Sequence, residues 1–222
     1  MVSKAIGLPE GIFVGRAAAP GIAHPLVAAV RGGEVVDITS RAAPTVRDIC
    51  EMDDPAGYVA SAGGRTLGGL DEIAANSFAD SRDPQKPRLL SPVDLQAVKA
   101  SGVTFVVSLL ERVIEEQARG DWARADAIRA DIAIHIGHDL SKLKPGSPEA
   151  MAIKASLIER GVWSQYLEVG IGPDAEIFTK CQPLASVGFG ADVGLHPVST
   201  WNNPEPEIAM IAASSGRIVG AT

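Results

Sequence analysis

The sequence contains few cysteines, few aromatic residues and no long hydrophobic run. Its 222 residues include two cysteines, Cys50 and Cys181, which lie far apart and lack the paired spacing of a zinc knuckle or of a disulfide-rich scaffold. No segment approaches the ~20 consecutive apolar residues of a membrane span, and the first residues lack a charged start followed by an apolar core. We therefore predict a cytoplasmic protein with no membrane partner.

Basic residues are also scarce relative to acidic ones. The chain has 20 Lys and Arg against 27 Asp and Glu, which leaves a net charge of -7. It has no basic run and no repeated aromatic and basic pattern, so it offers no surface suited to a phosphate backbone, and we predict no nucleic-acid partner. Hydrophobic residues make up 46% of the chain, which is enough for the core of one large domain or two smaller ones.

The first part of the chain is typical of short strands joined by glycine turns. Residues 26–31 and 34–39 flank Gly32-Gly33, a strong hairpin signal, and Thr45 with Asp48 forms a capping pair for a short helix ending near Glu51. The proline-rich residues 83–92 suit an extended connector. We predict a small β-rich N-terminal domain at residues 1–88 and a second domain at residues 89–222.

The second domain combines strand patterns with a helical insertion. Residues 103–107 favour a strand that runs into a helix near Ser108, and apolar residues recur at helical spacing from Asp121 to Ile136. Ser147-Pro148 begins a further helix. Strand composition then returns at four segments, residues 176–179, 185–189, 206–212 and 217–219.

Two glutamates separated by one residue are the strongest chemical signal. Glu205 and Glu207 stand in Pro204-Glu205-Pro206-Glu207 and lead into an apolar segment. On a strand this spacing places both carboxylates on the same face, where they repel each other unless solvent or a cation lies between them. Oxygen ligands of this kind suit a hard divalent ion. Taken alone, the pair also fits a solvated strand edge.

The surrounding segments resemble the fumarylacetoacetate hydrolase family. Asp174-Ala175-Glu176-Ile177-Phe178-Thr179-Lys180, followed by Trp201-Asn202-Asn203 and the glutamate pair, is most similar to the branch that contains 2-keto-3-deoxy-sugar-acid dehydratases. The resemblance implies an α+β, mainly β fold: a mixed β-sandwich or roll catalytic domain with a helical lid insertion. It also implies Glu176, Glu205 and Glu207 as magnesium ligands, with manganese or calcium as alternatives, and places Lys180 near the bound substrate.

The resemblance extends to a lid segment. Gly102-Val103-Thr104-Phe105 and the following helix are similar to the family's Gly-x-Asn-Tyr segment, which implies Thr104 and Ser108 as substrate-binding residues and Glu111 as a proton-transferring residue. The hydrolytic members carry a histidine where this chain has Ser108. Because a serine without an activating neighbour is a poor general base, the substitution favours dehydration over carbon-carbon bond hydrolysis.

The resemblance also implies a fourth metal ligand beyond the given sequence. In the family an aspartate in a Gly-Asn-Asp-Val segment completes the site, and that segment is expected directly after Gly220-Ala221-Thr222. We therefore expect the chain to be truncated at its C-terminus, and the full-length protein to be a homo-oligomer.

The sequence thus predicts a metal-dependent enzyme that eliminates water from a small 2-oxo acid, a 2-keto-3-deoxy sugar acid. Three alternatives stay open at this stage. One is a hydrolase of the fumarylacetoacetate or acylpyruvate type. The second is a fragment without activity, and the third is a β-rich module that only binds partners.

Overall fold

The computed structural model divides the chain into two compact units. It describes residues 7–102, 111, 113–115, 117–136, 143–174, 176–200, 204 and 206–222. Unit 1 comprises residues 1–98 and 181–222, and unit 2 comprises residues 99–180. Unit 1 is therefore built from two segments that are separated by more than eighty residues of chain.

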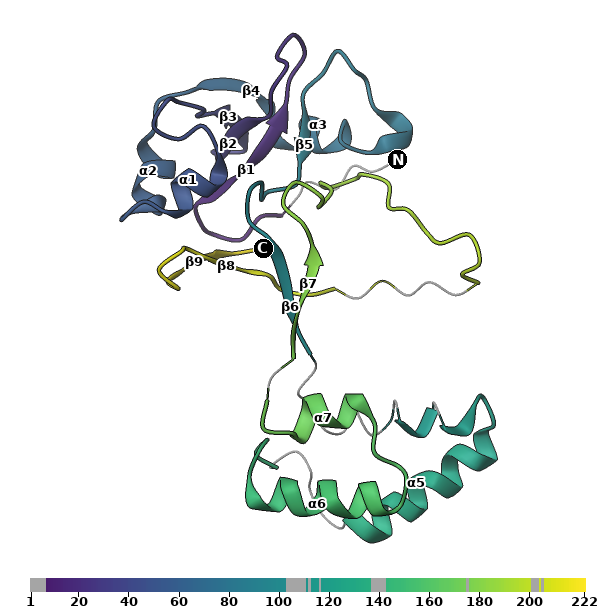
Figure 1. Cartoon of the computed structure of the whole chain (residues 1–222). Helices are drawn as coiled ribbons and strands as arrows, with labels where there is room; N and C mark the ends of the chain where they lie inside the picture. Colours follow the sequence, from purple (N-terminus) through teal and green to yellow (C-terminus); the bar gives the residue numbers. More distant parts are fainter. Residues whose placement is uncertain are drawn as a thin grey trace. The chain divides into compact units, whose positions relative to one another are not determined.

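The centre of unit 1 is a five-stranded sheet in the order β4-β3-β2-β1-β5 (Figure 1). All its neighbouring strands are antiparallel, and they are β1 (Phe13–Ala18), β2 (Leu26–Arg31), β3 (Glu34–Asp37), β4 (Arg65–Gly69) and β5 (Arg88–Leu90). The predicted hairpin at Gly32-Gly33 is confirmed, since β2 pairs with β3 and the two glycines have φ of 57° and 80°. Positive φ at both positions is the requirement of the two-residue turn that matches strand twist.

Helix α1 (Val46–Cys50) has the capping that the sequence predicts, together with a second cap from a distant residue. Thr45 and Asp48 form the expected capping box. The carboxylate of Asp94 also accepts hydrogen bonds from the backbone N–H groups of Val46 at 2.7 Å and Arg47 at 3.1 Å. Asp94 is only 4% exposed, so these bonds fix the start of α1 inside the unit.

Unit 1 contains two further short helices, which the sequence did not predict. Asp54 accepts a hydrogen bond from the N–H of Gly57 and thereby caps helix α2 (Pro55–Ser61). Helix α3 (Leu70–Ala75) follows β4 directly, and a short 3-10 turn covers Ala79–Ser81. Apolar side chains of α1, α2 and the strands share one buried cluster, which contains Val27, Ala29, Val36, Ile38, Ala43, Val46, Ile49, Cys50 and Val59.

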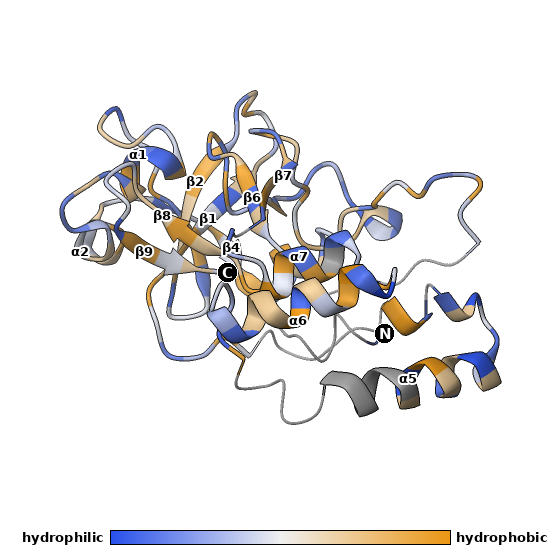
Figure 2. Ribbon diagram, turned by 60° about the horizontal axis from the view of Figure 1, so that its bottom comes forward, coloured by the Kyte–Doolittle hydropathy of each residue, from blue (hydrophilic) through white to orange (hydrophobic). Residues whose placement is uncertain are grey.

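The C-terminal hairpin belongs to the same core. Strands β8 (Met210–Ala212) and β9 (Ile218–Ala221) form a separate two-stranded antiparallel sheet. Ile211 and Val219 pack against the buried cluster that α1 and α2 share. The ribbons of β2 and β8 are both hydrophobic in Figure 2, in keeping with this packing. Apolar residues of the first strands and of the C-terminal hairpin therefore stabilise the same folded unit.

Unit 2 has a mainly helical core. It contains most of the two-stranded sheet of β6 (Val98–Ser101) and β7 (Ile177–Cys181), and the helices α5 (Trp122–Ile136), α6 (Pro148–Glu159) and α7 (Gln165–Ile171). The predicted helices from Asp121 and from Ser147-Pro148 are confirmed, and Ser147 caps α6. The buried cluster is Val113, Ile114, Ala118, Ala125, Ala150, Leu157, Leu167 and Ile171.

The predictions for residues 83–92 and for residues 185–189 are wrong. Residues 83–92 are not only a connector, because β5 pairs with β1 inside them, and a short edge strand tolerates the prolines on either side. Residues 185–189 do not form a strand. Side-chain contacts hold them instead: the rings of Phe189 and Phe78 meet edge to face at 5.2 Å, and the hydroxyls of Ser186 and Ser91 lie 2.6 Å apart.

The division into compact units also differs from the predicted boundary. A boundary between residues 88 and 89 would pass through β5, one of the five strands of the main sheet. The contacts instead separate a helical segment, residues 99–180, from the sheet-containing remainder. The predicted helical insertion thus corresponds to a compact unit of its own, together with the segment that carries Glu176 and Lys180.

We expect Asp94→Ala to destabilise unit 1 strongly. The substitution leaves two N–H groups of α1 without their acceptor and removes the carboxylate 3.9 Å from the Arg16 guanidinium, whose side chain is 10% exposed. Loss of a buried carboxylate with this many partners costs about 3 kcal/mol or more. Urea unfolding followed by circular dichroism would measure the loss. Asp80→Ala, at an exposed carboxylate of the same unit, should change stability by under ~0.5 kcal/mol.

Candidate functional site

Of the predicted metal-ligating glutamates, Glu207 lies just before the first strand of the C-terminal hairpin. The structure describes Pro204, Pro206 and Glu207, while Glu205 lies outside the described residues. Ala209 and Thr222 exchange two backbone hydrogen bonds, of 2.8 and 2.9 Å, which extend the pairing of β8 with β9 by one position. Glu207 is exposed and stands two residues before this pair, so the strand begins later than the predicted residue 206. The expected common face of Glu205 and Glu207 stays a prediction.

A clasp formed by three side chains fixes this hairpin on α1. Glu51, the residue that ends α1, accepts hydrogen bonds from the N–H of Ser214 at 2.9 Å and from its hydroxyl at 2.7 Å. Arg217 donates to the carbonyl of Asp53 at 2.7 Å and to that of Met52 at 2.5 Å. Because these groups hold the turn of the hairpin, they also limit where the glutamate segment that enters β8 can lie.

The segment that contains Glu176 forms part of unit 2. Its predicted strand is confirmed as β7, and the N–H of Gly102 donates to the carbonyl of Glu176 at 2.9 Å. The carboxylate of Glu176 is exposed, as is Lys180, whose ammonium lies 5.4 Å from the ring centre of Phe178. Both side chains are accessible to a small charged ligand, although neither is enclosed.

Glu111 is engaged in an ion pair. Both its carboxylate oxygens accept hydrogen bonds from the guanidinium of Arg129, Oε1 from Nε at 3.1 Å and Oε2 from Nη2 at 2.7 Å. The hydrogen bonds from Arg129 hold the pKa of Glu111 below its ordinary value, against a smaller opposing effect of burial. A carboxylate in this state is a weak base. Thr104 and Ser108, predicted beside it, lie outside the described residues.

The donors present suit magnesium chemically, but the described part of the chain contains no assembled site. Glu176 and Glu207 are exposed carboxylates that make no ion pair with any described residue, which leaves their oxygens free for a hard cation. Within the described residues no three His, Cys, Asp or Glu side chains gather closely enough to hold a metal. Glu176 belongs to unit 2 and Glu207 to unit 1.

Four residues of these arrangements were not predicted from the sequence. They are Glu51, Ser214 and Arg217 in the clasp, and Arg129 beside Glu111. The spacing of Asp126 and Arg129 along a predicted helix was a visible sign of an ion pair. No local pattern could have joined Glu51 to Ser214, since 163 positions separate them.

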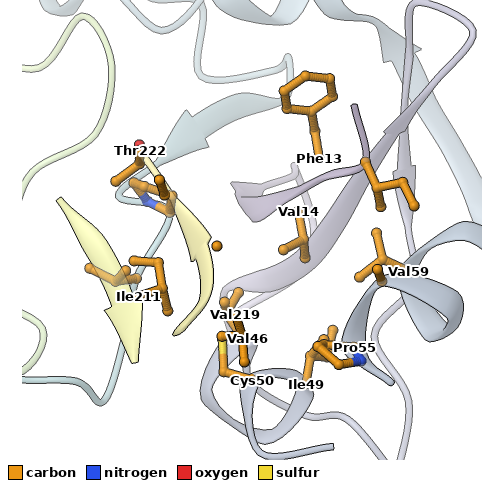
Figure 3. Close-up of a pocket in the computed structure, with 16 residues that line it drawn as sticks. Phe13, Val14, Val46, Ile49, Cys50, Pro55, Val59, Ile211, Val219 and Thr222 are labelled. Atoms are coloured by element: carbon orange, nitrogen blue, oxygen red, sulfur yellow. The ribbon is translucent and has the colours of Figure 1, made fainter. Parts of the chain in front are cut away.

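An apolar cavity of about 250 Å³ lies elsewhere in unit 1. Figure 3 shows side chains from β1, α1, α2 and the C-terminal hairpin turned toward it, among them Val14, Ile49, Val59 and Ile211. Burial, with a smaller effect of the nearby Asp94, raises the pKa of the Cys50 thiol in its wall. This mainly aliphatic lining does not suit a charged sugar acid.

No helix among the described residues has both the length and the apolar composition needed to cross a membrane.

Comparison with known proteins gives one short similarity. Over 47 residues the chain is 43% identical to a 2-dehydro-3-deoxy-D-arabinonate dehydratase of Saccharolobus solfataricus. The match covers 21% of this chain and 16% of that relative, so it spans well under a fifth of the dehydratase. No family model matches the chain, and no solved structure matches it. The similarity links this chain to a sugar-acid dehydratase over one segment.

We expect the clasp to make stability depend on pH. The hydrogen bonds from Ser214 lower the pKa of Glu51 from its ordinary 4.5. A lowered pKa means that the carboxylate stabilises the folded state fully above pH 4.5 and loses this effect as the pH falls through the lower folded value. Thermal unfolding of wild type and Glu51→Gln between pH 3 and pH 7 should show a gap in Tm that closes toward the acid end. A gap of constant size would contradict the expectation.

Proposed function

We propose that this chain is part of a divalent-metal-dependent dehydratase that eliminates water from a small 2-dehydro-3-deoxy sugar acid. The observation that carries the proposal is the 43% identity to a dehydratase of such an acid over 47 residues. The exposed, unpaired carboxylates of Glu176 and Glu207 support it, because they are ligands of the type that magnesium prefers. Manganese and calcium are alternatives.

We further propose the fumarylacetoacetate hydrolase family as the family of the chain, with its mixed β-sandwich or roll fold and a helical lid. The antiparallel sheet of unit 1 and the helices of unit 2 support this assignment. Exposed apolar side chains cluster in the sequence between residues 184 and 210, which supports the proposal of a homo-oligomer. These are Leu184, Val187, Phe189, Val193, Leu195, Val198, Ile208 and Met210.

The elimination breaks two bonds of the substrate and needs a proton carrier, a positive charge and a metal. A C–H bond next to the 2-oxo group breaks, the C–O bond on the following carbon breaks, a carbon-carbon double bond forms, and water leaves. Glu111 would move the proton, and Lys180 would balance the negative charge of the substrate. Thr104 and Ser108 would orient its hydroxyl groups. Glu176, Glu205 and Glu207 would hold the metal, which when bound stabilises negative charge on the 2-oxo and carboxylate oxygens.

Exchange of the three glutamates tests the proposal. In a protein that carries this chain, Glu176→Gln, Glu205→Gln and Glu207→Gln should each lower kcat/KM for 2-dehydro-3-deoxy-D-arabinonate by about 10²-fold or more, because loss of metal binding costs several kcal/mol. Binding of manganese, followed by electron paramagnetic resonance, should weaken in parallel. Glu159→Gln, at an exposed carboxylate outside the predicted site, should leave both measurements unchanged.

Three results would contradict the proposed function. Cleavage of an acylpyruvate without any dehydration would identify the protein as a hydrolase. Full dehydratase activity after exhaustive treatment with a chelator would remove the metal from the mechanism. A protein with neither activity and no manganese binding would support a role as a binding module or an inactive fragment.

A further inference from the structure

Arg129 binds the proposed proton-transferring residue through both carboxylate oxygens. Its Nε donates to Oε1 of Glu111 at 3.1 Å and its Nη2 donates to Oε2 at 2.7 Å. Paired N–H donors on a guanidinium match a carboxylate edge to edge, and this is the strongest geometry for such a pair. The side chains are 43% and 46% exposed, so the pair can open toward solvent.

A second carboxylate shares the same guanidinium. Asp126 lies three residues before Arg129 on α5 and accepts a hydrogen bond from its Nη1 at 2.7 Å. Asp126 is 79% exposed and makes this contact within its own helix, where the spacing of three residues favours it. Arg129 therefore uses separate N–H groups for its two partners and can release one while it keeps the other.

Glu111, Arg129 and Asp126 allow two arrangements, one with the ion pair of Glu111 closed and one with it open. With both oxygens occupied, Glu111 cannot accept a proton readily, and its pKa is lowered by the hydrogen bonds from Arg129. To react, it must turn away from Arg129. Asp126 reduces the cost of that movement, because the guanidinium keeps a charged partner after Glu111 leaves. Glu115, four residues after Glu111, is a further acidic residue of the same helical stretch.

We propose that Arg129 locks Glu111 in a resting state and that Asp126 retains Arg129 when Glu111 turns to the substrate. This inference rests on the proposed function of Glu111 and adds a positioning residue and a regulatory contact to it. Arg129 and Asp126 act through Glu111 and need not touch the substrate.

Two substitutions with opposite expected effects test the lock. Arg129→Gln removes the lock and should raise kcat severalfold, while Asp126→Asn leaves Glu111 as the remaining charged partner of Arg129 in this trio and should lower kcat severalfold. KM should change little in either variant, since neither residue binds the substrate. Arg124→Gln, an equal change of charge at an exposed position of α5, is the matched control and should leave kcat unchanged. A fall in kcat for both Arg129→Gln and Asp126→Asn would overturn the lock.

A titration of the side-chain carboxyl carbon of Glu111 by nuclear magnetic resonance reads the pair without any turnover. The pKa of Glu111 should lie below its ordinary value in wild type and rise toward it in Arg129→Gln, with no change in Arg124→Gln. An unchanged pKa in Arg129→Gln would show that the pair is absent and would overturn the lock even if the enzyme is an active dehydratase. A wild-type protein that dehydrates no 2-oxo sugar acid would overturn the proposed function, and the lock as part of that reaction with it.

Discussion

The buried carboxylate of Asp94 organises unit 1. It accepts hydrogen bonds from the first two N–H groups of α1. Asp94 follows β5 and Pro92-Val93 in the chain. Arg16 on β1 lies beside it and donates to the carbonyl of Val93 at 3.0 Å. One side chain therefore joins a helix, a central strand and the segment after an edge strand. Since α1 in turn carries Glu51, the position of the C-terminal hairpin also depends on this carboxylate.

The two segments that carry the predicted site residues are held in place by different interactions. The glutamate segment enters a hairpin that a buried apolar cluster and a polar clasp both hold in place. Glu176 and Lys180 lie on or beside a short two-stranded ladder with exposed side chains. Burial and paired polar groups make the first support rigid, while the second relies mainly on backbone hydrogen bonds.

Local signals in the sequence predicted local structure well. The turn at Gly32-Gly33, the capping box of Thr45 and Asp48, and the start of α6 at Ser147 each depend on neighbouring residues and were found. Contacts between distant residues were not predicted: β5 joining β1, Asp94 capping α1, and Arg129 binding Glu111. Such contacts leave no periodic pattern, because each partner looks ordinary in its own segment. The pair of Glu205 and Glu207 was visible from its spacing, whereas Glu176 and Lys180 came from a resemblance. The assembly of these residues cannot be read from spacing alone.

The discontinuous composition of unit 1 has a consequence for the order in which the protein matures during translation. The sheet strands β1 to β5 leave the ribosome early, yet Ile211 and Val219 complete the apolar cluster on which α1 and α2 pack. Residues 99–180 form a unit of their own and can reach their folded state while the end of unit 1 is still being synthesised. Until the hairpin has been synthesised, part of the apolar surface of the sheet is therefore uncovered. A chain that stops before residue 211 lacks this cover and leaves part of the apolar cluster in contact with water.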